Sequence, residues 1–497
     1  MRALQLESAS AVSIRSGSAE SLCDTLPEFD RGSFRDRTGR VFLQENRVFR
    51  ALKQRGLNDW QFAESLRFVQ DGMREKRLVP TRLVPFGLPA ESVRSGFVSV
   101  LEHKRLPIIT YPYEWCFSML RSAALLQLSL LNEALAEGAI LKDSSAFNIQ
   151  FYGTDPIFID LASITEFHEG QLWEGYEQFC CMFLFPLMLQ CYRDVDFQSW
   201  LRGSLSGIST TQMSGLVSLR DCFRPGVFTH VYLQSKLGRS DRREAASKNH
   251  SGVTQTLRDS GFRKSMIQSN VRQLLKIVEN LKWNRKESRW SAYDEISSPV
   301  RKDGVAKEEF VSQILATKRW KTVWDIGCNL GRYSRLASQH ADLVVAMDSD
   351  HLTVDAFCRQ LQEVRVTNVI PLVMNLADPS PSLGWRCSER SELSVRSQPE
   401  LIFCLAVIHH LVFRENLILA DVLSWLASLK ASLIIEYVDR SDPQVRSMLT
   451  DRADQFDDYS EAMFLEELGK HFEIRARRIL PSETRTLYFA VPRHPTQ

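Results

Sequence analysis

The chain contains 497 residues with a mass of 57.0 kDa, a length that predicts two folded units and a connector rather than one compact core. Hydrophobic residues make up 44% of the chain and charged residues 25%, which is typical of a globular protein and argues against extended disorder. The formal net charge of +2 excludes a global electrostatic attraction to nucleic acid or to an anionic membrane.

The ten cysteines are scattered and form no C-x-x-C pair. We therefore predict a reduced, cytoplasmic protein without a structural metal site. The N-terminal residues contain no continuous apolar segment of the kind that a signal peptide has. The most apolar run, "FCCMFLFPLMLQCY" from Phe179, is too short to span a bilayer, and we interpret it as a buried helix.

Residues 1–31 are weakly patterned and predict a flexible arm. In the α+β domain expected at 32–234, the Val- and Phe-rich runs of "GRVFLQENRVFRALKQ" predict a hairpin, and the prolines of "LVPTRLVPFGLPAESV" argue against a regular element there. The sequence "EWCFSMLRSAALLQLSLLNEALA" predicts a core helix. Farther on, "FNIQF" and "IFIDLASI" flank the turn "YGTDP" and predict a strand pair.

Residues 235–300 begin with the polar, basic stretch "SKLGRSDRREAASKNHSGVTQ" and are the predicted connector, with one helix near 265–282. Trp290 and Tyr293 near its end either close over a ligand or pack the connector onto the core. In the remaining domain, 301–497, strand-like and helix-like runs alternate from Lys321 onward. This alternation is typical of an α/β fold with a parallel sheet.

A glycine turn with two flanking acids opens this domain, in "VWDIGCNLGRYSRLASQHADLVVAMDSD". The turn spans Gly327 to Gly331 with the spacing G-x-x-x-G, which differs from the G-x-G-x-x-G of a dinucleotide site. Asp325, just before the turn, suits a ligand with a positive charge or an amino group, and Asp348, at the end of the next apolar run, suits ribose hydroxyls. S-adenosylmethionine has both features.

The segment "DIGCNLG" resembles motif I of class I S-adenosylmethionine-dependent methyltransferases, D/E-x-G-x-G-x-G, with Asn329 at the middle glycine. Asparagine tolerates a left-handed backbone better than other non-glycine residues, so the turn is expected to persist. The resemblance implies a Rossmann-like seven-stranded fold that binds S-adenosyl-L-methionine. The cofactor-binding residues that it implies are Asp325, Gly327, Asn329 and Gly331 around the methionine part, Asp348 at the ribose, and Asn375 and Leu376 beside the adenine.

The fourth expected strand, "LIFCLAVIHHL", resembles the methyltransferase segment that faces the methyl group, and His409 and His410 lie just beyond it. If the acceptor must lose a proton, His409 is the candidate base, although a structural histidine at a helix start would look the same. The strand lacks an Asn-Pro-Pro-aromatic motif, which favours an oxygen or a small-molecule acceptor over amide nitrogen. The pair "HFEIRARRIL" and "RTLYFAVPR" predicts a C-terminal hairpin, which is a trait of this family.

In the first half, Asp143, Asn148 and Asp160 resemble the catalytic core of a kinase-like domain in their order and spacing. There the first Asp orients a hydroxyl group, and the Asn and the second Asp hold magnesium. No His-Arg precedes Asp143, and no glycine-rich loop precedes the candidate lysine, Lys53. A degenerate kinase-like scaffold and an unrelated helix-rich domain both remain open.

Phrases along most of the chain, among them "YPYEW", "LKDSSAFN", "FIDLASI", "WDIGCNLGRYS" and "LAVIHHL", resemble the methyltransferase-like family that includes the nodulation protein NoeA. The resemblance implies a cytoplasmic protein with a role in host-specific nodulation. We expect a methyltransferase that acts on a small-molecule or oligosaccharide-type acceptor, with no nucleic-acid partner and no membrane span. The alternatives are a non-catalytic binding module with the same fold and a phosphotransferase activity in the first half.

Overall fold

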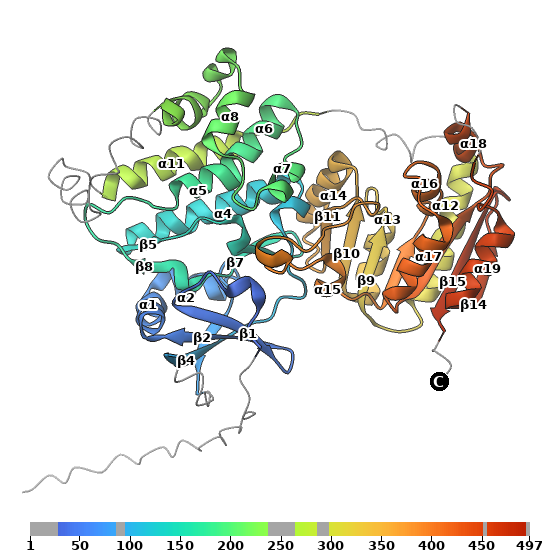
Figure 1. The fold of residues 1–497 in the computed structure, drawn as a ribbon, viewed down its shortest axis with the longest axis horizontal. Coiled ribbons are helices and arrows are strands. Elements are labelled where there is room, and N and C mark those ends of the chain that lie inside the picture. Colours follow the sequence, from blue (N-terminus) through green and yellow to red (C-terminus); the bar gives the residue numbers. More distant parts are fainter. Residues whose placement is uncertain (1–27, 86–94, 237–263, 286–297, 451–454, 494–497) are drawn as a thin grey trace, which may run out of the picture. The chain divides into compact units, whose positions relative to one another are not determined.

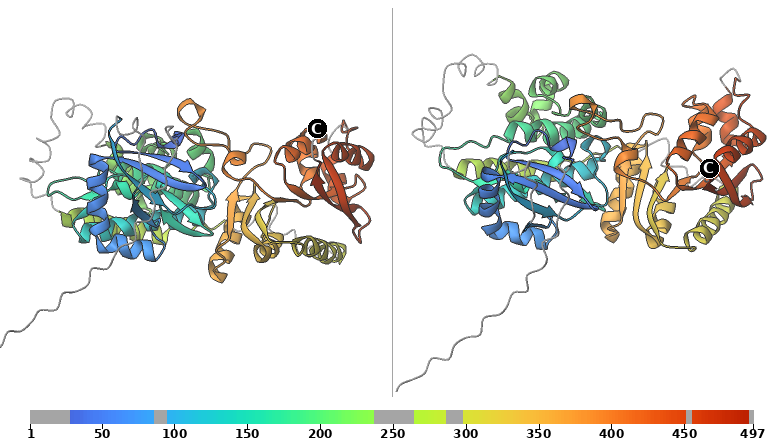
Figure 2. Two further views of the ribbon diagram at one scale, coloured as in Figure 1. Left: turned by 90° about the horizontal axis from the view of Figure 1, so that it is seen from below. Right: turned by 60° about the horizontal axis from the view of Figure 1, so that its bottom comes forward.

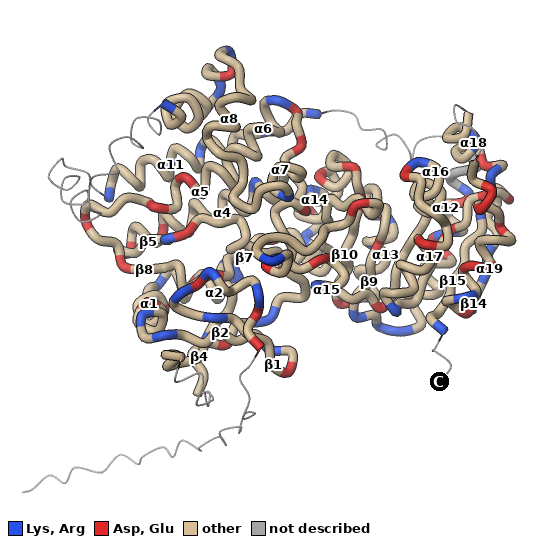
Figure 3. Tube along the Cα trace, in the orientation of Figure 1, with Lys and Arg blue, Asp and Glu red and all other residues tan. Residues whose placement is uncertain are grey.

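The computed structural model describes residues 28–85, 95–236, 264–285, 298–450 and 455–493. The chain divides into two compact units (Figure 1), the first comprising Met1–Asn58 and Thr81–Arg105, and the second Asp59–Pro80 and Leu106–Gln497. Most of the expected arm, the first part of the expected connector, and Trp290 with Tyr293 lie outside the described residues. Basic and acidic residues are interspersed along the chain (Figure 3), and their numbers nearly balance, with 62 Lys and Arg against 60 Asp and Glu.

The first unit contains an antiparallel sheet with the strand order β1-β2-β4-β3. Its strands are β1 (Gly39–Gln44), β2 (Arg47–Lys53), β3 (Thr81–Val84) and β4 (Phe97–His103), preceded by the short helix η1 (Arg31–Ser33). The predicted hairpin is confirmed as β1–β2, and both of its turn residues have positive φ, 48° at Glu45 and 68° at Asn46. Phe42, Phe49 and Phe97 pack in its core.

The expectation that prolines exclude a regular element after residue 78 was wrong. Thr81–Val84 pairs with β4, because Pro80 and Pro85 flank the strand and remove no amide hydrogen from within it. Two helices lie between β2 and β3, namely α1 (Gln54–Ser65) and α2 (Arg67–Arg74), which are separated at Leu66. Leu66 has an extended backbone and begins the second helix.

The second unit begins with a mainly helical part built around α4 (Phe117–Ala136), the predicted core helix, which is buried over most of its length. The apolar run from Phe179 is also a buried helix, as predicted, and its first part, Cys180–Leu184, is π-helical. The β6–β7 hairpin confirms the predicted strand pair. The elements of this part after α4 are β5 (Ala139–Leu141), η3 (Ala146–Asn148), β6 (Ile149–Tyr152), β7 (Asp155–Phe158), η4 (Leu161–Ser163), β8 (Ile164–Glu166), α5 (Tyr176–Phe179), η5 (Cys180–Leu184), α6 (Phe185–Arg193), α7 (Gln198–Gly203), α8 (Thr210–Leu216), η6 (Leu219–Phe223), η7 (Val227–Leu233) and α11 (Lys264–Asn280), and η2 (Pro112–Glu114) precedes it.

The rest of the second unit is an α/β domain with a seven-stranded sheet in the order β11-β10-β9-β12-β13-β15-β14. The first five strands in this order are parallel and β15 runs antiparallel to β13, which confirms both the α/β prediction and the C-terminal hairpin. The strands are β9 (Trp320–Ile326), β10 (Ala341–Asp348), β11 (Val369–Val373), β12 (Leu401–Cys404), β13 (Ser432–Val438), β14 (Phe472–Ile479) and β15 (Arg485–Pro492). The helices are α12 (Ser298–Leu315), α13 (Arg332–His340), α14 (His351–Val364), α15 (Leu393–Arg396), α16 (Ile408–Phe413), α17 (Leu419–Ser428), α18 (Pro443–Leu449) and α19 (Glu461–His471), with η10 (Trp385–Cys387) before α15.

Helices cover the sheet on both sides (Figure 2), and α12 packs beside α13 while α17 packs beside α19. From β9 the chain passes outward to β10 and β11 and then returns to place β12 on the other side of β9. The chain therefore continues from β9 toward one edge of the sheet, through β10, and from β12 toward the other edge, through β13. Ligands of open α/β sheets bind in the crevice that such a reversal creates at the carboxyl ends of the strands.

Across the described residues, no helix is both long enough and apolar enough to cross a membrane.

Candidate functional site

The turn after β9 has the left-handed backbone that its glycines suggested. The φ angles are 73° at Gly327, 48° at Asn329 and 72° at Gly331. Asn329 therefore adopts the conformation that asparagine was predicted to tolerate. The amides of Gly327 and Cys328 both donate to the carbonyl of Met347 on β10, at 2.8 and 3.0 Å, which attaches the turn to the neighbouring strand.

At Gly327 and Gly331 the neighbouring side chains also leave no room for a Cβ atom. A Cβ atom at Gly331 would lie 2.0 Å from the ring of Phe357 on α14, and one at Gly327 would lie 2.4 Å from Cγ2 of Val407. Val407 follows β12, so the second contact lies at the reversal point of the sheet. The turn can therefore approach β12 and α14 only because it lacks side chains at these two positions.

Asp325 lies on β9 just before the turn, and only 2% of its surface is exposed. Its Oδ2 accepts a hydrogen bond from Oγ of Ser334 on α13, at 2.5 Å. Burial raises the pKa of Asp325 to about 7, against the Ser334 hydrogen bond, which lowers it, and with a further upward contribution from the Asp348 carboxylate. At neutral pH this carboxyl group is thus poised between its two protonation states.

Asp348 ends β10 and its carboxylate faces the glycine turn. Oδ2 accepts from the amide of Asn329 at 2.9 Å, and Oδ1 accepts from the amide of Asp350 at 2.9 Å. Burial raises the pKa of Asp348, and these two amide hydrogen bonds work against that shift. The buried Oδ1 of Asn329 has no hydrogen-bond partner among the described residues, so the turn holds one acceptor that a ligand could satisfy.

Asn375 and Leu376 follow β11, beside the end of β10. The amide of Met374 donates to the carbonyl of Asp348 at 2.8 Å, which joins the two strand ends. Asn375 is exposed, and its Oδ1 accepts from the amide of Ala377 at 3.0 Å. The structure therefore brings the glycine turn, both acids and the residues after β11 to one edge of the sheet, and their contact with a ligand stays a prediction.

His409 and His410 lie on the short helix α16 beyond β12, as predicted. His409 is fully buried, and Gln444 lies beside its ring. Burial holds the pKa of His409 well below its usual value, and the neighbouring His410, Arg485 and Lys307 lower it further. A hydrogen bond with Gln444 acts in the opposite direction and favours the charged form. His409 is therefore neutral, which leaves one ring nitrogen able to accept a proton.

The connection between β12 and α16 is strained at Ala406, which has a φ of 55°. A residue with a Cβ atom is uncommon in this left-handed region and typically costs about 1–3 kcal/mol there. Strain of this kind is frequent where a loop has to present its neighbours to a ligand.

A buried cluster of charged residues beside His409 was missed by the sequence analysis. Glu436 on β13 is fully buried, and it pairs with Lys307 at 2.7 Å and with Arg485 at 3.5 Å. Arg485 also pairs with Asp442 at 2.8 Å. The one signal of this cluster in the sequence was Glu436 itself, an acid inside the apolar strand "SLIIEYV". Its partners Lys307 and Arg485 lie on α12 and β15, which are distant in sequence, so the sequence does not show the pairing.

Two of the three kinase-like candidates of the first half, Asn148 and Asp160, are in contact. Asp143 follows β5, Asn148 ends η3 and Asp160 follows β7. The Nδ2 atom of Asn148 donates to Oδ2 of Asp160 at 3.4 Å. In the chain as described, no group of three or more His, Cys, Asp or Glu side chains has an arrangement that could hold a metal ion.

The sheet order and the site together define the class of the α/β domain. The five parallel strands change their order of addition at β9, where the glycine turn lies, and the antiparallel strand β15 is inserted between β13 and β14. This is a Rossmann-like fold of the methyltransferase type, as the resemblance of motif I implied.

The comparison with known proteins identifies the family. The chain is 34% identical over 466 residues to the nodulation protein NoeA of Rhizobium meliloti (strain 1021), covering 92% of this chain and 94% of that protein. The chain therefore belongs to the NoeA family of nodulation proteins. It matches no protein-family model.

Solved methyltransferase structures are similar to about two fifths of the chain. Magnesium protoporphyrin IX methyltransferase from Synechocystis PCC 6803, with bound SAH, is 21% identical over 40% of this chain and 89% of that chain, with a TM-score of 0.30. The N-methyltransferase NodS from Bradyrhizobium japonicum WM9, in complex with S-adenosylhomocysteine, is 11% identical over 41% of this chain and 94% of that chain, with a TM-score of 0.31.

Proposed function

We propose that the protein transfers a methyl group from S-adenosyl-L-methionine to an acceptor. The observation that carries this proposal is the pair of carboxyl groups of buried Asp325 and partly buried Asp348, at the ends of neighbouring parallel strands with a left-handed glycine turn between them. A ligand that carries both an amino group and a ribose matches this pair. The cofactor when bound supplies an electrophilic methyl group on a sulfonium.

The side chains of the site fit this cofactor. Asp325 can carry a negative charge toward the ammonium group of the methionine part, and the unsatisfied Oδ1 of Asn329 adds an acceptor close by. Asp348 is held by two amides in the direction of the turn, where it can accept hydrogen bonds from ribose hydroxyls. Asn375 and Leu376 border the adenine in this arrangement.

For the acceptor we propose a small-molecule or oligosaccharide-type compound that is methylated on oxygen, and a cytoplasmic role in host-specific nodulation. The name of NoeA supports the biological role. Neutral, buried His409 is proposed as the group that receives the acceptor's proton. Methyl transfer needs alignment of the acceptor and exclusion of water more than it needs a strong base, so a weakly basic histidine is sufficient.

Calorimetric titration with S-adenosylhomocysteine tests the cofactor site. We expect micromolar binding by the wild-type protein and its loss in Asp348→Asn, which removes the charge but keeps the shape. Asp342→Asn is the matched control because Asp342 lies at the opposite end of the same strand, where it is exposed and paired with Arg319. Equal binding by all three proteins would contradict the assignment of Asp348.

The rival interpretation is a non-catalytic module that uses the same fold to bind a partner. The two are separated by complementation of a nodulation-deficient strain with Asp348→Asn. An enzyme loses its biological activity with the cofactor, whereas a binding module that does not use the cofactor retains it.

A phosphotransferase activity in the first half is the second candidate, which the contact between Asn148 and Asp160 favours. These two residues are the types that hold magnesium–nucleotide in kinases, and Asp143 precedes Asn148 by the kinase spacing. The test is magnesium-dependent ATP turnover by the wild-type protein and by Asp160→Ala. Asp155→Ala is the control, because Asp155 is an exposed residue on the adjacent hairpin. Turnover that survives in Asp160→Ala would rule out this site.

A further inference from the structure

The segment between β11 and β12, residues 375–400, carries little regular structure beyond η10 and α15. Residues from the helical part of the second unit hold this segment in place, although they lie between 176 and 287 positions away in the sequence. We propose that this helical part is a positioning element of the methyl-donor site, because it holds the segment that begins with Asn375 and Leu376. This inference rests on the proposed function, which places these two residues beside the adenine.

The first attachment lies directly at the turn that carries the adenine-side residues. Arg202, on α7, donates to both carboxylate oxygens of Asp378 at 2.7 and 2.9 Å, and to the carbonyls of Asp378 and Pro379 at 3.1 and 3.2 Å. The amide of Asp378 in turn donates to the carbonyl of Asn375 at 3.1 Å. One guanidinium group therefore donates to four acceptors in the turn, and two of them are backbone carbonyls.

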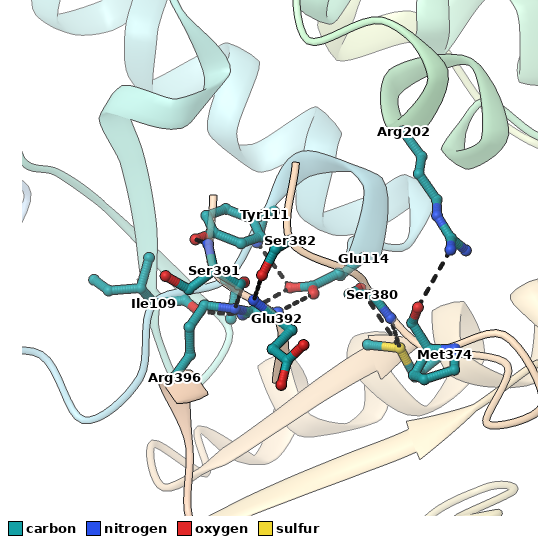
Figure 4. Close-up of polar contacts among 12 residues, drawn as sticks. Ile109, Tyr111, Glu114, Arg202, Met374, Ser380, Ser382, Ser391, Glu392 and Arg396 are labelled. Carbon is teal, nitrogen blue, oxygen red and sulfur yellow. Dashed lines mark hydrogen bonds and ion pairs between the residues drawn. The ribbon is translucent and has the colours of Figure 1, made fainter. Parts of the chain in front are cut away.

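The second attachment holds the far end of the segment. Arg396, on α15, pairs with Glu114 through both carboxylate oxygens and donates to the carbonyl of Ile109 (Figure 4). Its guanidinium carbon lies 4.3 Å from the centre of the Tyr111 ring, and the Tyr111 hydroxyl accepts from the amide of Ser391 at 2.9 Å. Both partners of the ion pair are buried, with 4% of the Arg396 side chain and none of the Glu114 side chain exposed.

The middle of the segment contacts the candidate phosphotransfer loop. The guanidinium carbon of Arg390 lies 4.1 Å from the centre of the Phe147 ring. Phe147 precedes Asn148 in η3, and its ring also packs edge-on against Tyr111 at 5.9 Å. The segment is thus attached at its start, middle and end, all within the second unit.

This attachment bears on ligand binding through conformational entropy. Fixing the backbone of a residue costs conformational entropy, and a ligand that has to order a loose loop loses that free energy from its affinity. A turn that is already fixed by Arg202 binds the adenine without that cost. The Arg202–Asp378 pair is partly exposed, at 30% and 69% of the two side chains, so its loss affects global stability little.

The experiment compares the wild-type protein with Arg202→Ala, with Arg202→Lys and with Arg319→Ala as the matched control. Arg319 also pairs with one aspartate and one backbone carbonyl, but at the start of β10. We expect Arg202→Ala to weaken S-adenosylhomocysteine binding about five- to twenty-fold with an unchanged melting temperature, and Arg202→Lys to restore part of the affinity. Amide hydrogen exchange in the turn at 374–380 should also accelerate in Arg202→Ala without any ligand.

Affinity within about twofold of the wild-type value in Arg202→Ala, or an equal loss in Arg319→Ala, would overturn the inference while leaving the proposed function intact. Absence of binding by the folded wild-type protein would overturn the proposed function, and this inference with it.

Discussion

Asp325 is the residue whose chemistry depends most on its surroundings. An exposed aspartate is fully ionised at neutral pH, but burial and the nearby Asp348 carboxylate raise the pKa of Asp325 to about 7. A bound ammonium group stabilises the ionised form. Binding of the cofactor is therefore expected to release a proton from Asp325 when the pH is near or below 7.

This linkage predicts a pH-dependent affinity. Binding of S-adenosylhomocysteine should weaken about tenfold between about pH 8 and pH 6, because the ligand has to displace the proton of Asp325. Asp325→Asn should bind weakly and lose this dependence on pH. Calorimetry in two buffers with different ionisation enthalpies measures both the affinity and the released proton, and a constant affinity in the wild-type protein would contradict the assigned role.

The same group predicts how stability depends on pH in the absence of ligand. The pKa of Asp325 is raised above its unfolded value, so the folded state binds the proton more tightly. Its contribution to the free energy of unfolding is complete below about pH 4 and is lost as the pH rises through about 7. In the wild-type protein the free energy of unfolding, measured by urea titration, should therefore decline by on the order of a few kcal/mol over this pH range. Asp325→Asn should remove this decline, whereas Asp342→Asn should keep it.

At the scale of elements, the glycine turn couples β9 to α14. Gly331→Ala places a Cβ atom against the Phe357 ring and forces a side chain into a left-handed backbone. We expect a loss of about 2–4 kcal/mol in the free energy of unfolding and a loss of cofactor binding. Chemical denaturation measures the first effect and calorimetry the second.

Gly469→Ala is the control for this substitution. Gly469 lies inside α19 with nothing within 4 Å of an added Cβ, so the substitution should stabilise the protein by about 0.5–1 kcal/mol. Equal effects of the two substitutions would contradict the role of the Phe357 contact.

At the scale of the whole molecule, the buried pair of Glu114 and Arg396 links segments 282 positions apart. Glu114→Gln leaves the Arg396 charge buried without a counter-ion and should cost about 3–5 kcal/mol in the free energy of unfolding. Glu473→Gln removes an exposed pair with Arg475 and should cost less than about 1 kcal/mol. A similar melting temperature for the two variants would show that the buried pair contributes little.

The sequence predicted the order of the α/β elements, the glycine turn with its acids, the buried core helices and the C-terminal hairpin. These features depend on local patterns, namely apolar periodicity, glycine positions and turn residues, which are read from neighbouring positions. The left-handed backbone of Asn329 could also be predicted locally, because its conformation follows from the turn in which it lies. The strand at Thr81–Val84 was missed because prolines beside a strand look the same in sequence as prolines within one.

Only the tertiary structure decided which distant side chains share an environment. The pairing of Glu436 with Lys307 and Arg485, and the attachment of residues 375–400 by Arg202 and Arg396, depend on how the sheet and helices pack. The raised pKa of Asp325 also depends on complete burial next to a second carboxylate. Local sequence encodes the conformation of each element, but burial and electrostatic energies depend on neighbours that folding brings together.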